Sequence, residues 1–103
     1  MADGVTVTVA ISLKEVVDEF CASLPEGIQA TVAFDGFRDI RVVRNKDRPN
    51  HLLFIERWES EAAYNAYIKW RTETGAMADL AAVVTAPPTR EIWPTVVAAG
   101  CAA

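Results

Sequence analysis

The run LLFIERWESEAAYNAY, Leu52–Tyr67, contains the clearest change from strand to helix in this sequence. Its first half is apolar and aromatic, which is typical of a strand. Ser60 then supplies an N-cap, and Glu61 occupies the first helical turn, where the helix dipole favours an acidic side chain. We therefore predict a strand over His51–Glu59 and a helix that runs from Ser60 to about residue 74.

The predicted strand is unusual because it is apolar on both faces. Side chains alternate along a strand, so Leu53 and Ile55 point one way, while Leu52, Phe54 and Trp58 point the other way. An antiparallel strand with one solvated face should not show this pattern. We expect helices on one side, and a cavity, a second sheet or a second subunit on the other.

The segment before this strand begins with a regular alternation. GVTVTVAI, Gly4–Ile11, places its valines on one face and its threonines on the other, which predicts a first strand. Ser12 and Glu15 have the spacing of a capping box, so we predict that a helix opens at Ser12. Pro25 and Gly27 are expected to end this helix.

Four further segments complete the order of elements. Ile28–Asp35 is compatible with a short strand or a helical turn. Gly36–Asn45 predicts a second strand. It should form a hairpin with the strand from His51, because the residues KDRPN between them, at 46–50, are of the types that favour turns. Ala76–Val84 predicts a short helix, and Thr89–Val97 a last strand that Pro94 restricts to an edge or a strand end.

The predicted fold class is α+β. The order β-α-β-β-α-β, with an extra short helix before the last strand, indicates a ferredoxin-like four-stranded antiparallel sheet. The 103 residues suffice for a single domain, 1–103, with tails at 1–3 and 98–103 that we expect to be flexible. At 51% apolar residues, a chain this short has little interior to hide them, so some apolar surface should meet a partner chain.

Charge and composition argue against several classes of function. The formal net charge is −4 and no basic stripe is present, which disfavours nucleic-acid binding. The sequence shows neither a signal peptide nor an apolar run of the length that a membrane span needs. We expect a cytoplasmic protein. Cys21 and Cys101 form no disulfide framework or zinc spacing, and His51 is the only histidine, so no metal site is expected.

The runs GFRDIRVVRN, LLFIERWES, AYNAYIKWRTETG and PPT, taken together, resemble the antibiotic biosynthesis monooxygenase family. The resemblance covers roughly Gly36–Trp93, and its most specific part is the E-x-W-x-S motif at Glu56–Ser60. It implies a ferredoxin-like subunit that forms a homodimeric α+β barrel, with a pocket between sheet and helices. Some members oxidise quinols or polycyclic aromatic polyketides with dioxygen and use no flavin, haem or metal.

The sequence departs from the family at three places. Tyr67 stands where many members have histidine, nine residues after the motif tryptophan. Phe54 stands where relatives that oxidise polyketides can carry asparagine. The first strand has no asparagine, which haem-degrading relatives use, so the resemblance does not favour haem chemistry.

Three residues are candidates for catalysis. Trp58 is expected to wall the pocket and to donate its N–H to a substrate carbonyl; the alternative is a core tryptophan. Tyr67 is expected to donate a hydrogen bond to a substrate oxygen, and the alternative is helix packing. Glu56 shares a strand face with Trp58 and is expected to accept a phenolic proton. Further pocket residues are Phe54, Tyr64, Trp70, Arg71 and Trp93.

For Glu56 a structural role is the competing interpretation. Burial should raise the pKa of its carboxyl group unless a cation or hydrogen bonds compensate. Arg41, Arg57 and Arg71 are available as ion-pair partners.

The predicted function is that of a cofactor-independent monooxygenase that oxidises a phenolic, quinol or polyketide-type aromatic with dioxygen. The alternatives are a dimer that binds a small aromatic ligand or is purely structural, and a cyclase or isomerase on the same fold.

Overall fold

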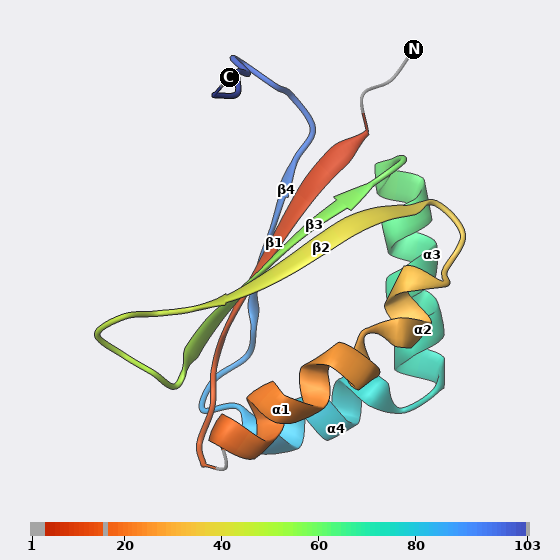
Figure 1. Ribbon diagram of the computed structural model, residues 1–103. Coiled ribbons are helices and arrows are strands. Elements are labelled where there is room, and N and C mark those ends of the chain that lie inside the picture. The colour runs from red at the N-terminus through yellow and green to blue at the C-terminus, as the bar shows by residue number, and fades with distance from the viewer. Residues whose placement is uncertain (1–3, 16, 103) are drawn as a thin grey trace.

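The computed structural model describes residues 4–15 and 17–102, so the expected tail at 1–3 and the last residue lie outside the described part. The elements follow the predicted order, including the extra helix before the last strand (Figure 1). They are β1 (Val5–Ser12), α1 (Val17–Gly27), α2 (Gln29–Val32), β2 (Phe37–Arg44), β3 (His51–Trp58), α3 (Glu61–Glu73), α4 (Ala76–Val83) and β4 (Thr89–Trp93).

The four strands form one antiparallel sheet with the order β2-β3-β1-β4. The predicted hairpin between the second and third strands is confirmed. Its turn is held by the side chain of Asn45, whose Oδ1 accepts hydrogen bonds from the backbone N–H groups of Asp47 and Arg48 at 2.9 and 2.8 Å. β4 is an edge strand that ends just before Pro94, as a residue without a backbone N–H requires.

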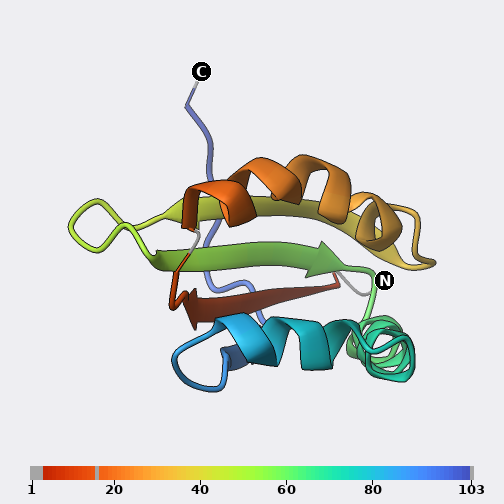
Figure 2. The ribbon, with the colours of Figure 1, turned by 90° about the horizontal axis from the view of Figure 1, so that it is seen from below.

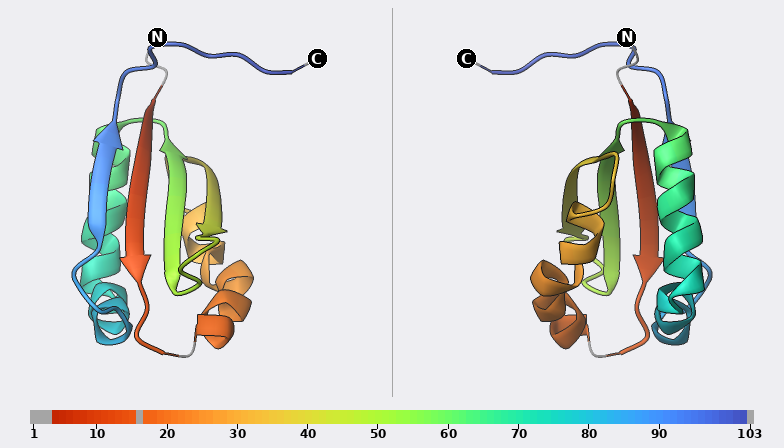
Figure 3. Two further views of the ribbon diagram at one scale, coloured as in Figure 1. Left: turned by 90° about the vertical axis from the view of Figure 1, so that its left-hand side faces the viewer. Right: turned by 90° about the vertical axis from the view of Figure 1, so that its right-hand side faces the viewer.

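All helices lie on one face of the sheet, in two groups. Figure 2 shows α1 and α2 over the side of β2 and β3, and α3 and α4 over the side of β1 and β4. The opposite face carries no helix among residues 4–15 and 17–102, and the segment after β4 runs away from the body as an extended arm (Figure 3). Within the described part of the chain, no helix has the length and apolarity to cross a membrane.

The predicted capping box at Ser12 and Glu15 is wrong. β1 continues to Ser12, which pairs with His51 across the sheet, and its hydroxyl lies 3.1 Å from the Nε2 atom of that histidine. The antiparallel pairing with β3 thus holds the residue in a strand, and α1 is described from Val17. The helix also includes Pro25, which was expected to end it.

β3 alternates as predicted. Leu52, Glu56 and Trp58 are buried on the helix side, at 3%, 6% and 0% exposure. Leu53 and Ile55 fall on the opposite face, which the described chain leaves without a covering element (Figure 3).

Two apolar clusters form the core at the two ends of the helix-covered face. One gathers around Trp58, the other around Leu13, and Val9 of β1 packs against both. The first contains Val5, Val7, Trp58, Tyr64 and Tyr67, and the second contains Ile11, Leu13, Leu52 and Val84.

Candidate functional site

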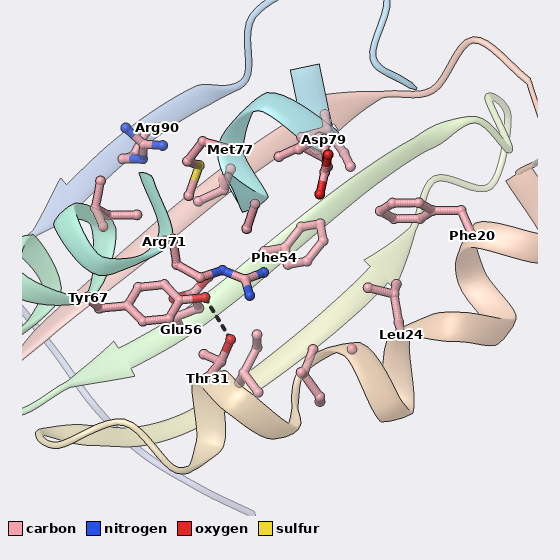
Figure 4. A pocket seen from close by; sticks show the side chains of 18 of the residues that line it. Phe20, Leu24, Thr31, Phe54, Glu56, Tyr67, Arg71, Met77, Asp79 and Arg90 are labelled. Atoms are coloured by element: carbon pink, nitrogen blue, oxygen red, sulfur yellow. Dashed lines mark hydrogen bonds between the residues drawn. The ribbon is translucent and has the colours of Figure 1, made fainter. Parts of the chain in front are cut away.

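A cavity of about 540 Å³ lies between the sheet and the helices. α1 and α2 form one wall, α3 and α4 form the other, and the central strands form the floor (Figure 4). Its volume lies within the range of about 300–1,000 Å³ that is usual for small-molecule sites. Most of the lining is apolar, and the polar or charged side chains that face it are Ser23, Thr31, Glu56, Tyr64, Tyr67, Arg71, Asp79 and Arg90.

Glu56 is the buried carboxylate of this cavity. Its Oε1 accepts a hydrogen bond from the indole N–H of Trp58 at 2.9 Å. Burial raises the pKa of Glu56 above its ordinary value, while the Trp58 bond and the charges of Arg90 and Arg71 oppose this rise. The carboxylate is therefore a stronger base than an exposed glutamate when it is ionised.

The ion pair considered for Glu56 does not form among the described residues. Arg57 pairs with Asp39 on the other face of the sheet, and its Nε donates to Asp39 Oδ2 at 2.6 Å. Arg41 lies on that same face, because it pairs with Ile55 across the sheet, and it is exposed to solvent. The Trp58 indole is the hydrogen-bond partner of Glu56 instead.

Two tyrosines of α3 face the cavity. The hydroxyl groups of Tyr67 and Thr31 are 2.6 Å apart, so this bond joins α3 to α2 across the cavity (Figure 4). The hydroxyl of Tyr64 is buried and donates to no acceptor in the described part of the chain, and Arg90 lies close enough to lower the pKa of this phenol against the effect of burial. Burial raises the pKa of Tyr67, and raises the pKa of Tyr64 to about 12. Both phenols therefore stay protonated near neutral pH and are hydrogen-bond donors rather than bases.

Five of the predicted site residues are brought together around this cavity, and three are not. Phe54, Glu56, Tyr64, Tyr67 and Arg71 line it. Trp58 is fully buried beneath the lining, with its ring centroid 4.9 Å from that of Tyr67. Its N–H is already bonded to Glu56, so it is not free to meet a ligand carbonyl.

The other two tryptophans lie away from the cavity. Trp70 packs against Phe34, with ring centroids 5.5 Å apart. Trp93 lies on the opposite face of the sheet, where it is 51% exposed and its N–H donates to Thr8 Oγ1 at 2.9 Å. His51 also lies outside the cavity, beside Ser12.

Sequence reasoning missed several lining residues. Arg90 had a usable signal, because it lies two residues before Ile92 on β4 and so shares the face that packs on the core. Phe20 and Leu24 of α1 lie four residues apart, and this spacing is equally typical of a helix that simply packs on a sheet. Thr31 had no signal, because its role depends on where α2 meets Tyr67.

Among residues 4–15 and 17–102, no group of three or more histidine, cysteine, aspartate or glutamate side chains is arranged to hold a metal ion. The charged side chains at the cavity are two carboxylates and two guanidinium groups, which suit proton transfer and anion binding.

Comparison with known proteins gives a family and a fold. The family model described as antibiotic biosynthesis monooxygenase matches residues 5–82. No functionally curated protein matches the chain.

Solved structures of low sequence identity share the fold. A mutant of SnoaB, a cofactor-independent oxygenase from Streptomyces nogalater, superposes with a TM-score of 0.80 at 18% identity, over 95% of this chain and 97% of that one. A candidate antibiotic biosynthesis monooxygenase from Deinococcus radiodurans gives 0.80 at 21% identity, over 96% and 99%. A conserved protein from Methanosarcina mazei Go1 gives 0.78 at 20%, over 90% and 93%.

Proposed function

This chain belongs to the antibiotic biosynthesis monooxygenase family, and on that premise we propose that it is a cofactor-independent monooxygenase for a phenolic or quinol-type aromatic compound. The observation that carries the proposal is the buried Glu56 at the floor of an apolar cavity. The similarity in fold to SnoaB, an oxygenase described as cofactor-independent, supports it.

The chemistry follows from an electron-rich substrate. For an anthrone, which is the keto tautomer of a phenol, Glu56 accepts one proton from the ring methylene. The resulting anion, which is the same as that of the phenol, passes an electron to dioxygen. The radical pair combines to form a C–O bond, and the peroxide anion takes the proton back from Glu56. The resulting hydroperoxide then loses water together with the remaining hydrogen of the same carbon, which leaves a carbonyl group. One oxygen atom remains in the new carbonyl group and the other leaves in the water.

The protein's own contribution is to bind the substrate, to remove its proton and to shield the resulting anion from water. The apolar walls exclude water from the carbanion, and the raised pKa of Glu56 strengthens the base. Tyr64, whose hydroxyl donates to no acceptor in the described chain, is placed to donate a hydrogen bond to a substrate oxygen.

Oxygen uptake tests the proposal directly. Quinols and anthrones are offered to the protein with and without dioxygen, and consumption is followed at an oxygen electrode. Glu56→Gln keeps an acceptor for the Trp58 N–H but removes the base, so kcat should fall about 100-fold or more. Glu59→Gln, which changes an exposed carboxylate three residues along, should behave like wild type. No uptake across the whole panel would overturn the proposal.

Trp58→Phe gives a second signature of the same mechanism. This variant keeps an aromatic ring but loses the N–H bond that lowers the pKa of Glu56. The basic form of Glu56 then appears only at higher pH, so the rise of the rate with pH should move upward. A pH profile identical to that of wild type would contradict this role of Trp58.

A second candidate is a protein that binds an aromatic ligand without turning it over. Tyr67 favours this case, because it stands where many members of the family have histidine. Burial raises the pKa of its phenol, so this residue is a poor base at that position. Calorimetric binding of anthrones without oxygen uptake would identify this case.

The proposal includes a homodimer. The uncovered sheet face presents Leu53, Ile55 and the half-exposed Trp93, and a second copy of the chain would cover these apolar side chains.

A further inference from the structure

Arg71 reaches into the cavity from the last turn of α3. Its guanidinium carbon lies 5.7 Å from the centre of the Tyr67 ring, and Figure 4 shows the group pointing toward the middle of the cavity, beside Phe54. Its Nε is buried and has no hydrogen-bond partner in the described chain, and no described carboxylate forms an ion pair with it.

A buried N–H of a cationic group without an acceptor is unfavourable, because it has lost water and gained nothing in return. The Nε–H and one Nη–H of an arginine point in parallel and match the two oxygen atoms of a carboxylate. An anion of this shape would satisfy the orphaned donor of Arg71.

The surroundings of Arg71 favour a flat apolar body on the same ligand. Figure 4 places Phe54 next to the guanidinium, with Phe20 and Leu24 beyond it on the opposite wall. A ring that extends from an anion held at Arg71 would therefore meet aromatic and aliphatic side chains.

The other charges at the cavity do not cancel the preference of Arg71 for an anion. Arg90 adds a second positive charge from β4. Asp79 of α4 opposes it, but this carboxylate is on an exposed residue and forms no ion pair in the described chain. Glu56 lies close enough for the charges of Arg71 and Arg90 to lower its pKa, but its Oε1 accepts from the Trp58 N–H and it forms no ion pair with either guanidinium in the described chain.

We infer that Arg71 is the anion-recognition residue of the cavity and that the ligand is a hydroxylated aromatic carboxylate. The inference rests on the proposed function only in taking this ligand as the substrate. Arg71 determines specificity through the carboxylate, while Glu56 acts on the reacting part of the ring.

The test is calorimetric titration without dioxygen, with 1-hydroxy-2-naphthoate and 1-naphthol as a pair of probes that differ in the carboxylate. Wild type should bind the naphthoate about tenfold or more tighter than the naphthol. Arg71→Gln should abolish this preference and leave the Kd of 1-naphthol within about threefold of the wild-type value.

Three variants act as controls. Lys69→Gln removes one positive charge from the exposed side of the same helix, and should keep the preference. Arg71→Lys keeps the charge without the planar fork, and should retain part of it. Asp79→Asn removes the opposing carboxylate, and should tighten the naphthoate alone. Circular dichroism checks that each variant is folded. If Arg71→Gln does not fold, Arg71→Lys replaces it as the test variant.

Equal affinity of wild type for the two probes, or an equal loss for both in Arg71→Gln, would overturn the inference. Oxygen uptake separates it from the proposed function. If the Arg71-dependent preference is found but no quinol, anthrone or hydroxynaphthoate consumes oxygen, the anion site stands and the monooxygenase proposal fails. If oxygen is consumed but Arg71→Gln leaves the preference unchanged, the monooxygenase stands and the anion site fails.

Discussion

Glu56 and Trp58 lie two residues apart on β3 and therefore face the same side of the sheet. The sequence shows this pairing, and the structure adds that the indole N–H donates to the carboxylate. The indole is thereby committed to Glu56 and is a positioning group rather than a cavity wall. A hydrogen bond between neighbours on one strand face depends on rotamers, which strand alternation alone does not specify.

The pKa of Glu56 is raised in the folded protein, so its protonated form is favoured by folding. This stabilisation is complete below the unfolded-state pKa and is lost as the pH rises through the raised folded-state pKa. The loss is about 1.4 kcal/mol for each unit by which the two pKa values differ. The measurement is urea unfolding from about pH 4 to pH 9. As the pH increases, the free energy of unfolding of Glu56→Gln should rise relative to that of wild type.

Glu59→Gln is the matched control for this series, because Glu59 is exposed. Its free energy of unfolding should follow that of wild type at every pH. A constant difference between Glu56→Gln and wild type across the series would show that burial does not perturb this carboxyl group.

At the scale of the elements, local chemistry predicted most boundaries and tertiary contacts changed the rest. Ser60 caps α3 as expected, with its Oγ accepting from the backbone N–H of Ala63 at 3.1 Å. Ser12 has equally good capping chemistry, yet the ladder with β3 keeps it in β1. The segment that periodicity left open is α2, a single helical turn too short for a periodic pattern to identify.

The link between α2 and β2 provides the element-scale prediction. Gly36 has φ of +88°, and a Cβ atom there would lie 2.6 Å from the Cβ of Ala63 on α3. Gly36→Ala therefore combines backbone strain with a clash, and should lower the free energy of unfolding by about 2 kcal/mol or more.

Gly27→Ala is the paired control, measured by the same urea titration. Gly27 ends α1, and a Cβ atom there would meet nothing within 4 Å. Alanine should leave the stability unchanged or raise it by up to about 1 kcal/mol. A similar loss in both variants would mean that the contact with Ala63 does not limit Gly36.

For the whole molecule, the sequence predicted an apolar strand with two covered faces, and one chain covers only one of them. The helices pack on the side of Trp58, and the cavity lies on that side as well. The other side, with Leu53 and Ile55, is left open by the described chain (Figure 3). A single sequence can reveal this surplus of apolar surface but not the geometry of what covers it.

We expect the purified protein to be a dimer, with a mass by light scattering near twice 11.3 kDa at micromolar concentration. Ile55 lies centrally on the open face, between Thr8 and Arg41 in the sheet register. Ile55→Lys should place a charge in the interface and yield monomers. Ala66→Lys, which adds the same charge on the exposed side of α3, should remain dimeric, and a monomeric wild type would contradict the expectation.

The three tryptophans give the molecule a set of intrinsic optical probes. Trp58 is sealed in the core, Trp70 is half-buried, and Trp93 is 51% exposed on the open face. Their fluorescence should therefore differ in emission wavelength and in access to a quencher such as iodide. Association of two chains would shield Trp93 from the quencher. An aromatic ligand in the cavity would instead change the emission of Trp58, because Trp58 contacts the cavity-lining residues Tyr67 and Glu56. One spectrum could thus follow assembly and ligand occupancy separately, without an added label.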